Sequence, residues 1–459
     1  MQILGIIYCK SWEFFIANLG NLISFLSLCT RNYNHVIMEY ISRYAEKDIE
    51  RALRSAGAVL VVGPKFCGKT TTSMRFQNSF VKLNTNSRIK LARLNPMQTL
   101  NGERPRLIDE WQTVPEIWNC VKEDLDEKYE FGKYILTGSS TPVDKNEIHH
   151  SGAGRITAVK MRPMSLFESG ESKGLVSLYE LFEGKPLKAF DENADFTLED
   201  MAFLTCRGGW PISVISDKSV SLDVTRNYFN SLFVFEDCDN ENFRNKRPDV
   251  LKMILRSYAR NISSEASKQT IIEDVRQSNK RTMDTKTFDD YLEALQDLYI
   301  ISDIEAWNPN IRSKTSIRST PTRHFVDTSI ACRALNIFPE DLINDLESFG
   351  LFFEDLAVRD LSVYAGVHGG EVRHYRDKAG LECDAVIHLE DGRWGAVEIK
   401  LGGDKLIDEG VKSLTLLKEK IATKSSERHP SFLMVLTARG SLYQRKDGIY
   451  VVPINCLRD

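Results

Sequence analysis

The chain has 459 residues, enough for roughly two to four domains with cores of their own. A hydrophobic fraction of 42% and a charged fraction of 27% are those of an ordinary globular protein, and a net charge of −4 means that any nucleic-acid-binding surface is local. Nine cysteines without a CxxC pair argue against a disulfide framework and a zinc ribbon, and indicate a reducing, cytoplasmic location.

Residues 1–37 are interpreted as an N-terminal extension, and whether they belong to the functional protein stays open. The stretch 14–30 carries no charge, but its 17 residues lie at the lower limit for a membrane span and include Asn18, Gly20 and Asn21. No small-residue cleavage site follows convincingly. We favour an appendage or upstream extension over membrane association.

Short apolar runs alternate with helical stretches between residues 57 and 165. The run AVLVV at 58–62 has the β-branched content of a buried strand, and a helix begins near Thr70. Strands that alternate with helices predict a parallel α/β sheet. The other elements expected here are strands at 80–83, 105–108, 134–136 and 156–161 and a helix at 114–128.

Three further regions follow this core. Residues 171–245 are expected to form a helical lid, broken at GGWP (208–211). Residues 246–335 hold three helical patterns and then an apolar–polar stretch, an order that resembles a winged helix. Residues 336–459 predict the order α-β-β-β-α-β-β. The helices are expected at 251–262, 270–277, 287–299, 351–364 and 407–421, and the strands at 372–375, 383–389, 394–401, 432–436 and 449–453.

The sequence GPKFCGKT fits the phosphate-loop pattern GxxxxGK[ST] in full, between an expected strand and an expected helix. Its glycines let backbone N–H groups face phosphate oxygens, and the helix adds its N-terminal dipole. Lys69 can reach the β- and γ-phosphates, and the Thr70 hydroxyl can ligate Mg²⁺. We therefore predict a site for Mg²⁺ and ATP, with guanine specificity left open. The predicted binding residues are Gly63, Pro64, Lys65, Phe66, Cys67, Gly68, Lys69, Thr70 and Thr71.

Two adjacent carboxylates, Asp109 and Glu110, follow the expected strand in RLIDEW. Asp109 suits the Mg²⁺ shell, and Glu110 can orient and polarise an attacking water as the catalytic residue. Adjacent carboxylates are usually a solvated turn, but the apolar strand and the phosphate loop favour the functional interpretation.

Three residues beyond this pair are candidates for contact with the γ-phosphate. Thr137 or Ser139, at the end of the next strand, could sense that phosphate, although a plain turn is the alternative. Arg155 could stabilise the charge of the transferring phosphoryl group, in cis or from a neighbouring subunit, although a lone arginine is more often a surface residue.

The motifs GPKFCGKTT, RLIDEWQ, YILTGSS, GAGRITAVKMRPMSLFE and GGWP stand in the order seen in AAA+-like ATPases of the bacterial and archaeal STAND type. These prokaryotic ATPases carry a C-terminal domain of unknown function. The resemblance covers residues 38–456 and implies an ATPase core at 38–170. It also implies that Pro211 lies in the lid near the adenine. The first 37 residues have no counterpart in the family pattern.

A second set of candidate residues lies near the C-terminus. Asp384 stands in ECDAVI, and Glu398 and Lys400 stand in WGAVEIKL, where residues two apart project to the same side of a strand. Asp384 and Glu398 could share a divalent metal, Lys400 could hold the attacking water, and Glu354 could complete the site from the preceding helix. The arrangement resembles the PD-(D/E)xK nuclease superfamily, although Cys383 replaces the proline.

A basic stretch lies in the region that resembles a winged helix, and it could contact a DNA backbone. A basic loop is usually only solvated. The residues concerned are Arg312, Lys314, Arg318 and Arg323.

Three functions are therefore compatible with the sequence. The leading hypothesis is an AAA+/STAND-type ATPase that couples its nucleotide state to a DNA-facing or partner-facing C-terminal domain. Such a protein could also form a homo-oligomer. The first alternative is an ATP-gated, metal-dependent DNA nuclease. The second is a non-catalytic interaction module switched by nucleotide.

Overall fold

The computed structural model describes residues 40–138, 154–188, 190, 196–233, 246–279, 283–309, 320–424 and 429–459. The predicted features at residues 1–37 and at Ser139, Arg312, Lys314 and Arg318 lie outside the described residues. No helix in these ranges combines the length and the apolar character needed to cross a membrane.

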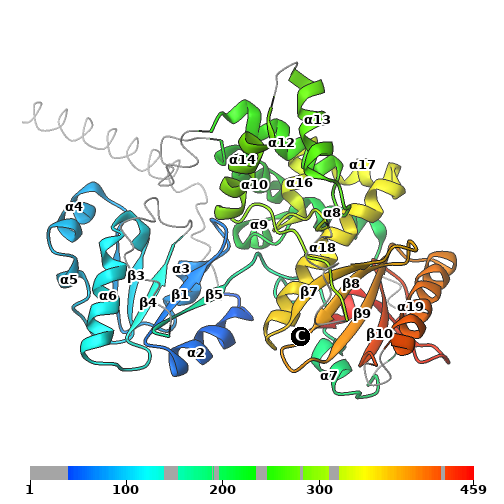
Figure 1. The fold of residues 1–459 in the computed structure, drawn as a ribbon, viewed down its shortest axis with the longest axis horizontal. Helices are drawn as coiled ribbons and strands as arrows, with labels where there is room; N and C mark the ends of the chain where they lie inside the picture. Colours follow the sequence, from blue (N-terminus) through cyan, green and yellow to red (C-terminus); the bar gives the residue numbers. More distant parts are fainter. Residues whose placement is uncertain are drawn as a thin grey trace, which may run out of the picture. The chain divides into compact units, whose positions relative to one another are not determined.

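A five-stranded parallel sheet forms the N-terminal part of the described chain, in the order β2-β3-β4-β1-β5 (Figure 1). The parallel α/β sheet predicted from the sequence is confirmed. Because β4 lies between β1 and β3, the carboxyl ends of these three strands meet at one edge of the sheet. The strands are β1 (Ala58–Val62), β2 (Ser79–Lys82), β3 (Arg106–Asp109), β4 (Tyr134–Thr137) and β5 (Ile156–Lys160).

Helices cover both faces of this sheet. On one face α6 buries Ile117, Val121 and Leu125, spaced four residues apart, in one core with Ala58 and Leu136. The alternate residues of the strands face α2, as their period of two requires. The helices are α2 (Ala45–Ser55), α3 (Lys69–Ser73), α4 (Asn86–Leu94), α5 (Pro96–Thr99) and α6 (Glu116–Glu127), and the 3-10 turn η1 spans Trp111–Thr113.

The middle of the chain is mainly helical. Three helices, α12, α13 and α14, precede two antiparallel bridges, Ile301↔Phe325 and Ile304↔Thr322, where the sequence suggested a hairpin. The winged helix stays a prediction, because isolated bridges take the place of regular strands. The elements are β6 (Val176–Ser177), α7 (Leu178–Phe182), α8 (Leu198–Arg207), α9 (Pro211–Ile215), α10 (Lys218–Ser231), α12 (Pro248–Arg260), α13 (Lys268–Asn279), α14 (Thr285–Asp297), α16 (Thr328–Leu335) and α17 (Pro339–Asn344).

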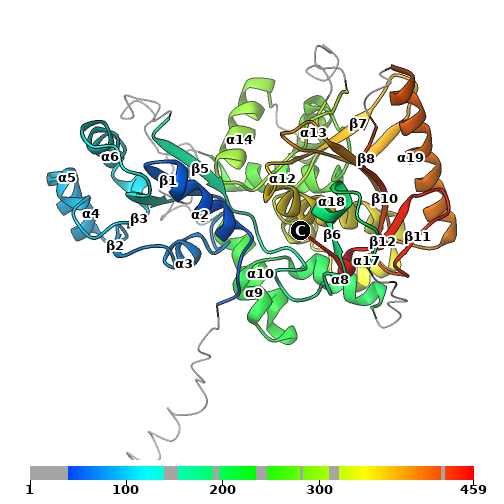
Figure 2. The same cartoon turned by 90° about the horizontal axis from the view of Figure 1, so that it is seen from below.

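A separate six-stranded mixed sheet forms the C-terminal part, in the order β11-β12-β10-β9-β8-β7. Ala385 and Ile387 share a core with α18, whereas Val386 shares a core with α19, so the two helices cover opposite faces (Figure 2). The elements are α18 (Leu346–Gly366), β7 (Glu371–Arg376), β8 (Glu382–His388), β9 (Trp394–Lys400), α19 (Asp404–Lys424), β10 (Phe432–Thr437), β11 (Tyr443–Gln444), β12 (Tyr450–Pro453), η2 (Ile454–Cys456) and β13 (Leu457–Arg458).

The last strand does not join this sheet. β13 pairs in parallel with β6, so that Leu457 lies opposite Val176. The expected order of elements in the C-terminal region omits β11 and β13, because two-residue strands carry no detectable alternation.

Candidate functional site

The phosphate loop runs from β1 into α3, and two of its glycines have backbone conformations that side chains disfavour. Gly63 has φ +148°, and a Cβ atom at this position would lie 2.1 Å from the carbonyl oxygen of Met161. Gly68 has φ +99° and is the N-cap of α3. The loop can follow this path only because both positions lack a side chain.

Lys69 is folded back along its own loop. Its side chain is buried, and Nζ donates hydrogen bonds to the carbonyl oxygens of Gly63 (2.8 Å) and Pro64 (2.7 Å). The ammonium group is thus held beside the backbone N–H groups of the loop, where phosphate oxygens would compete for it.

Asp109 lies at the carboxyl end of β3 and joins two neighbouring elements. Thr70 Oγ1 and Thr137 Oγ1 both donate to its Oδ1, at 2.8 and 2.6 Å. Its Oδ2 is buried without a hydrogen-bond partner, and Lys82 Nζ lies 3.8 Å away. A buried carboxylate oxygen with unused bonding capacity beside a threonine hydroxyl fits the hard oxygen donor set of Mg²⁺.

Thr137 is completely buried, and its hydroxyl is engaged with Asp109. Because it ends the strand between β1 and β3, it links the carboxylate to the centre of the sheet. This placement fits a role for Thr137 in orienting Asp109. The contact of Thr137 with a γ-phosphate, expected from the sequence, stays a prediction.

Glu110 has a left-handed backbone conformation, with φ +58°, which is uncommon for a residue other than glycine. Its N–H donates to the carbonyl oxygen of Thr137 (2.8 Å), and Gln112 donates to its carboxylate. The sharp change of direction after β3 places Glu110 in the wall of the same pocket as Asp109. Backbone strain of this kind is often found at functional sites.

A pocket of about 400 Å³ lies over the phosphate loop. It brings together predicted residues of the loop, the carboxylate pair and Pro211, which is more than a hundred positions away in sequence. No motif pointed to Lys82 and Ile212, which also line this pocket. Cys67 is buried, with Sγ 3.8 Å from the Met161 carbonyl oxygen. The lining residues are Lys65, Phe66, Gly68, Lys69, Thr70, Thr71, Lys82, Asp109, Glu110, Gly138, Pro211 and Ile212.

Arg155 lies at the opposite edge of the sheet. It immediately precedes β5, whose first residue pairs with Ala58 at the start of β1, and its side chain forms an ion pair with Asp126. The amino end of a parallel sheet is the far side from the phosphate loop. The predicted role of Arg155 in cis is therefore wrong for the nucleotide of the same chain, and a role in a neighbouring subunit stays a prediction.

Arg43 supports the phosphate loop from behind, and no motif pointed to it. Its guanidinium group donates to the carbonyl oxygens of Cys67 (2.7 Å) and Arg162 (2.7 Å) and to Glu168 Oε1 (3.0 Å). The side chain is only 5% exposed. The contacts join segments far apart in sequence, so only the tertiary structure reveals them.

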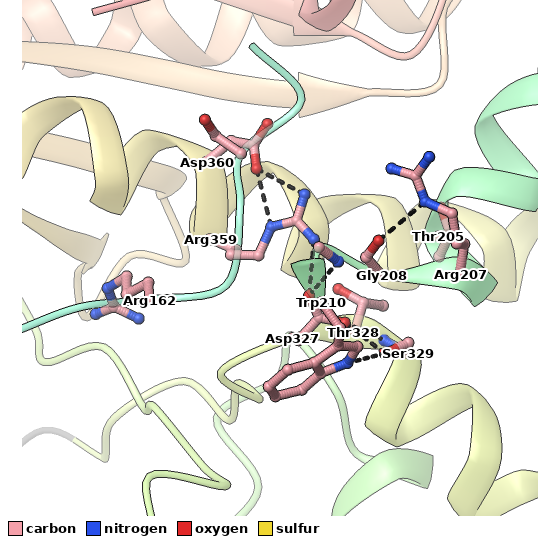
Figure 3. A network of polar contacts seen from close by, with 12 residues as sticks. Arg162, Thr205, Arg207, Gly208, Trp210, Asp327, Thr328, Ser329, Arg359 and Asp360 are labelled. Carbon is pink, nitrogen blue, oxygen red and sulfur yellow. Dashed lines mark hydrogen bonds and ion pairs between the residues drawn. The ribbon is translucent and has the colours of Figure 1, made fainter. Parts of the chain in front are cut away.

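A buried polar network connects the lid with the C-terminal part (Figure 3). The N–H of Gly209 donates to Asp327 Oδ2 (2.8 Å), and Trp210 Nε1 donates to Ser329 Oγ (3.0 Å). Arg359, on α18, lies between two carboxylates and donates to Asp327 and to Asp360.

The network also reaches the segment that follows β5. The N–H of Leu166 donates to Asp360 Oδ2 (2.9 Å), and the N–H of Met164 donates to the carbonyl oxygen of Gly209 (2.7 Å). The GGWP segment is thus fixed on one side to the segment that leaves the five-stranded parallel sheet and on the other to α18.

The predicted C-terminal residues meet, but a lysine occupies the centre. Lys400 Nζ lies 2.9 Å from Asp384 Oδ2 and 2.8 Å from Glu398 Oε2. Ser413 donates to Glu398 (3.0 Å), and the N–H of Ile399 donates to Asp384 (2.7 Å). The lysine therefore engages one oxygen of each of the two carboxylates that were expected to share a metal ion.

Burial and the charge of Asp384 raise the pKa of Glu398 to about 8 and raise the pKa of Glu354 above its ordinary range. Burial opposes the charge of Lys400, but Asp384 and Glu398 together raise the pKa of Lys400. Within the described ranges, no group of three or more His, Cys, Asp or Glu side chains could hold a metal ion. The predicted metal site of Glu354, Asp384 and Glu398 does not fit this arrangement.

Arg323 is the described member of the predicted basic stretch, and the DNA contact predicted for it is wrong. The side chain is 3% exposed, and it pairs with Asp303 (2.6 Å) and donates to the carbonyl oxygen of Ala266 (2.9 Å). A buried, paired guanidinium group cannot reach a phosphate backbone.

Three parts of the chain match known families. Residues 55–169 match the AAA domain, residues 198–341 match the domain of unknown function DUF8612, and residues 349–457 match the domain of unknown function DUF4143. The chain is also similar to uncharacterized proteins of Mycobacterium bovis and Mycobacterium tuberculosis. Each is 23% identical over 398 residues, which cover 84% of this chain and 81% of the relative.

Two solved structures are also similar to parts of the chain. A Walker-type ATPase of Pyrococcus abyssi is 15% identical, covering 64% of this chain and 96% of that chain with a TM-score of 0.41. A STAND protein of Pyrococcus horikoshii with a tetratricopeptide repeat sensor is 14% identical, covering 72% of this chain and 48% of that chain with a TM-score of 0.24. With the match at residues 55–169 and the parallel sheet that carries the phosphate loop, the chain contains an AAA-type ATPase domain.

Proposed function

We propose that the protein is an ATPase of the AAA+/STAND type that transmits the state of its nucleotide pocket to the C-terminal domain. The observation that carries this proposal is the dual contact of the GGWP segment. Pro211 lines the pocket, while Gly209 and Trp210 bond to Asp327 and Ser329, which lead to Arg359 on α18. A shift of the lid on nucleotide binding would therefore move groups bonded to the C-terminal part.

In the proposed site, Lys69 and the loop N–H groups bind the phosphates, and Thr70 and Asp109 hold Mg²⁺. Bound Mg²⁺ neutralises charge on the phosphate oxygens. Glu110 orients the attacking water, and Thr137 keeps Asp109 in position by its hydrogen bond. Arg43 keeps the loop in shape from behind.

The nucleotide part of the proposal is tested by Mg-ATP binding and turnover in Lys69→Ala. Charge-assisted hydrogen bonds of about 1.5–3 kcal/mol are lost, so we expect affinity to fall roughly tenfold or more and turnover to vanish. Lys446→Ala, an exposed lysine outside the pocket, serves as the matched control. Equal affinity in Lys69→Ala and the wild type would refute the proposed site.

The coupling part is tested by hydrogen exchange of the α18 amides with and without Mg-ATP. We expect nucleotide to change their protection in the wild type. Ser329→Ala removes the hydroxyl between Trp210 and Asp327, and should reduce this response while Mg-ATP still binds. Ser362→Ala removes a hydroxyl that bonds only within α18, and should leave the response intact. A full response in Ser329→Ala would contradict the proposed route.

For the C-terminal domain, we propose a binding role toward DNA or a partner protein rather than metal-dependent cleavage. Lys400 between Asp384 and Glu398 supports this choice, because its ammonium group pairs with one oxygen of each carboxylate, in the place that a shared metal ion would take. Incubation with Mg²⁺ or Mn²⁺ and single- or double-stranded DNA should give no cleavage. Cleavage that disappears in Glu398→Ala would establish the nuclease alternative instead.

A further inference from the structure

A second cavity, of about 420 Å³, lies outside the nucleotide pocket. Its walls come from the start of α2, the end of β5, the segment around Ser302 and the contact of α18 with β7. A volume of this size is typical of sites for small molecules. Two cationic side chains line this cavity: Lys160, the last residue of β5, and Arg162, two residues further along the chain.

Lys160 and Arg162 have no carboxylate at ion-pair distance in the described parts of the chain, and the buried Asp355 acts on Arg162 only through its charge. Within the parts of the chain that the structure describes, neither forms an ion pair, and Arg162 donates only to the hydroxyl of Ser302 (3.0 Å). Figure 3 shows Arg162 on the segment after β5, away from the bonded cluster of Arg359. Lys160 keeps solvent-exposed surface, as a group that receives a ligand from solvent must.

Most of the acidic groups around the cavity already have cations of their own. Asp303 pairs with Arg323, Glu168 with Arg43, Glu371 with Arg373, and Asp48 with Arg51. Glu305 also lines the cavity, and it is exposed, so that solvent screens its charge. With those four pairs neutral, Lys160 and Arg162 stand against Glu305, so the groups around the cavity carry one positive charge in excess.

The pKa values of both cations are lowered, in line with this excess of positive charge. The charge of Arg162, together with burial, lowers the pKa of Lys160 to about 8. Burial lowers the pKa of Arg162 to about 10. An anion placed between these cations would relieve both effects.

We propose that Lys160 and Arg162 bind a phosphate monoester in this cavity, at a site separate from the phosphate loop. The two positive charges match the charge of a phosphate monoester dianion, and the guanidinium geometry suits phosphate oxygens. The remaining volume accommodates the organic group of the ester. Ser302, which already contacts Arg162, adds a hydroxyl at the same wall.

The site is connected to the phosphate loop through one residue. Arg43 donates to the carbonyl oxygen of Arg162 and to the carbonyl oxygen of Cys67 within the loop. A ligand that draws Arg162 toward it acts on a residue two hydrogen bonds from the phosphate loop. The site is thus placed to adjust nucleotide affinity.

The proposal is tested by calorimetric titration of the full chain with ribose 5-phosphate. A non-hydrolysable ATP analogue and Mg²⁺ are present at saturation, so that the phosphate loop is filled. We expect one site, with affinity reduced roughly tenfold or more in Lys160→Met and in Arg162→Met. Lys446→Met should bind like the wild type. The same titration in Lys69→Ala without nucleotide should retain the site, which separates this proposal from the nucleotide site.

Absence of binding in the wild type at millimolar ligand, or unchanged affinity in both variants, would overturn the proposal. Because each variant removes one of two repelling cations, we expect both to fold, and their melting temperatures check this. If one variant fails to fold, the other decides. A dinucleotide that binds better with a 5′-phosphate than with a 5′-hydroxyl would support a nucleic-acid end as the source. A free phosphate ester that binds without this gain would support a small metabolite.

Discussion

At the scale of single residues, Asp109 joins two elements of the proposed nucleotide site. Two threonine hydroxyls from different elements donate to the same carboxylate oxygen, and the other oxygen is buried with unused capacity. Thr70 belongs to the loop that would hold phosphate, whereas Thr137 belongs to the sheet. The Thr70 hydroxyl can leave Asp109 and bind a metal ion instead. The Thr137 hydroxyl keeps the Asp109 carboxylate in position.

Thr137→Val should therefore weaken the use of Mg²⁺ more than the binding of nucleotide itself. The substitution removes one buried hydrogen bond, worth about 1 kcal/mol, and lets the Asp109 carboxylate turn. We expect the Mg²⁺ concentration for half-maximal turnover to rise several-fold, measured by titrating Mg²⁺ at saturating ATP. Thr415→Val, at an exposed site on α19, is the control. An unchanged Mg²⁺ dependence would show that Thr137 does not position Asp109.

Glu398 should make the stability of the protein depend on pH. Its pKa is raised from 4.5 to about 8 by burial and Asp384. Between these values the folded state holds a proton that the unfolded state has lost, so stability falls as pH rises from 4.5 toward 8. Glu398→Gln imitates the protonated carboxyl group. We expect the decrease in melting temperature from pH 6 to pH 9 to be smaller in this variant.

The control for that measurement is Glu123→Gln, an exposed glutamate on α6, which should lose as much stability as the wild type over the same range. An identical decrease in Glu398→Gln and the wild type would mean that Glu398 is ionised in the folded state.

At the scale of elements, α18 connects the two sheets. It packs on one face of the C-terminal sheet, and Arg359 and Asp360 bond it to the start of α16 and to the segment that leaves the ATPase sheet. Arg359 is completely enclosed, and both of its carboxylate partners are buried. Such a cluster holds its elements in one arrangement, because a charge without its partner is costly to bury.

Arg359→Met should destabilise the protein by roughly 3–5 kcal/mol, since Asp327 and Asp360 would both remain as buried charges. We expect Arg359→Met combined with Asp327→Asn and Asp360→Asn to recover a large part of this loss. Denaturant unfolding gives both values. A triple variant that is less stable than Arg359→Met alone would show that the charges are not the source of the effect.

Gly209→Ala tests the close approach of the lid to the segment after β5. A Cβ atom would lie 2.0 Å from the carbonyl oxygen of Met164, so the backbone must move, at about 1–3 kcal/mol. Gly350, in α18, has no atom within 4 Å of such a Cβ atom, and Gly350→Ala should be neutral or slightly stabilising. Thermal unfolding compares the two variants, and equal melting temperatures would exclude the tight contact.

At the scale of the whole molecule, the last residues of the chain reach back to the region just after the ATPase sheet. Leu457 pairs with Val176, Ser172 donates to the carbonyl oxygen of Leu457 (2.6 Å), and Asp459 forms ion pairs with Lys47 and His368. The C-terminal part is thus joined to the region after the ATPase sheet by the β13–β6 pair and by α18, and to α2 by the ion pair of Lys47 and Asp459.

Removal of residues 457–459 should lower the melting temperature and expose the backbone around β6 to hydrogen exchange. The strand pair and the burial of Leu457 are lost together. Asp459→Ala keeps the strand pair and removes only the ion pairs, so its effect should be smaller. A truncated chain as stable as the wild type would mean that this link is not needed for the fold.

The local order of residues was enough to locate most strands and the phosphate loop, because both depend on neighbours along the chain. Short apolar runs located the strands of the two sheets, except β11, within one or two residues. GxxxxGK[ST] is a contiguous pattern whose backbone path follows from its glycines. The carboxylate pair next to a strand was also visible, since the carboxyl ends of parallel strands share one edge.

Which charged side chains meet became visible only in the folded chain. It placed Arg155 at the far edge of the sheet, buried Arg323 against Asp303, and set Lys400 between two carboxylates that had been expected to hold a metal. It also revealed Arg43 behind the phosphate loop. The physical reason is that an ion pair depends on distance and burial, which are set by the packing of elements far apart in sequence rather than by the local pattern.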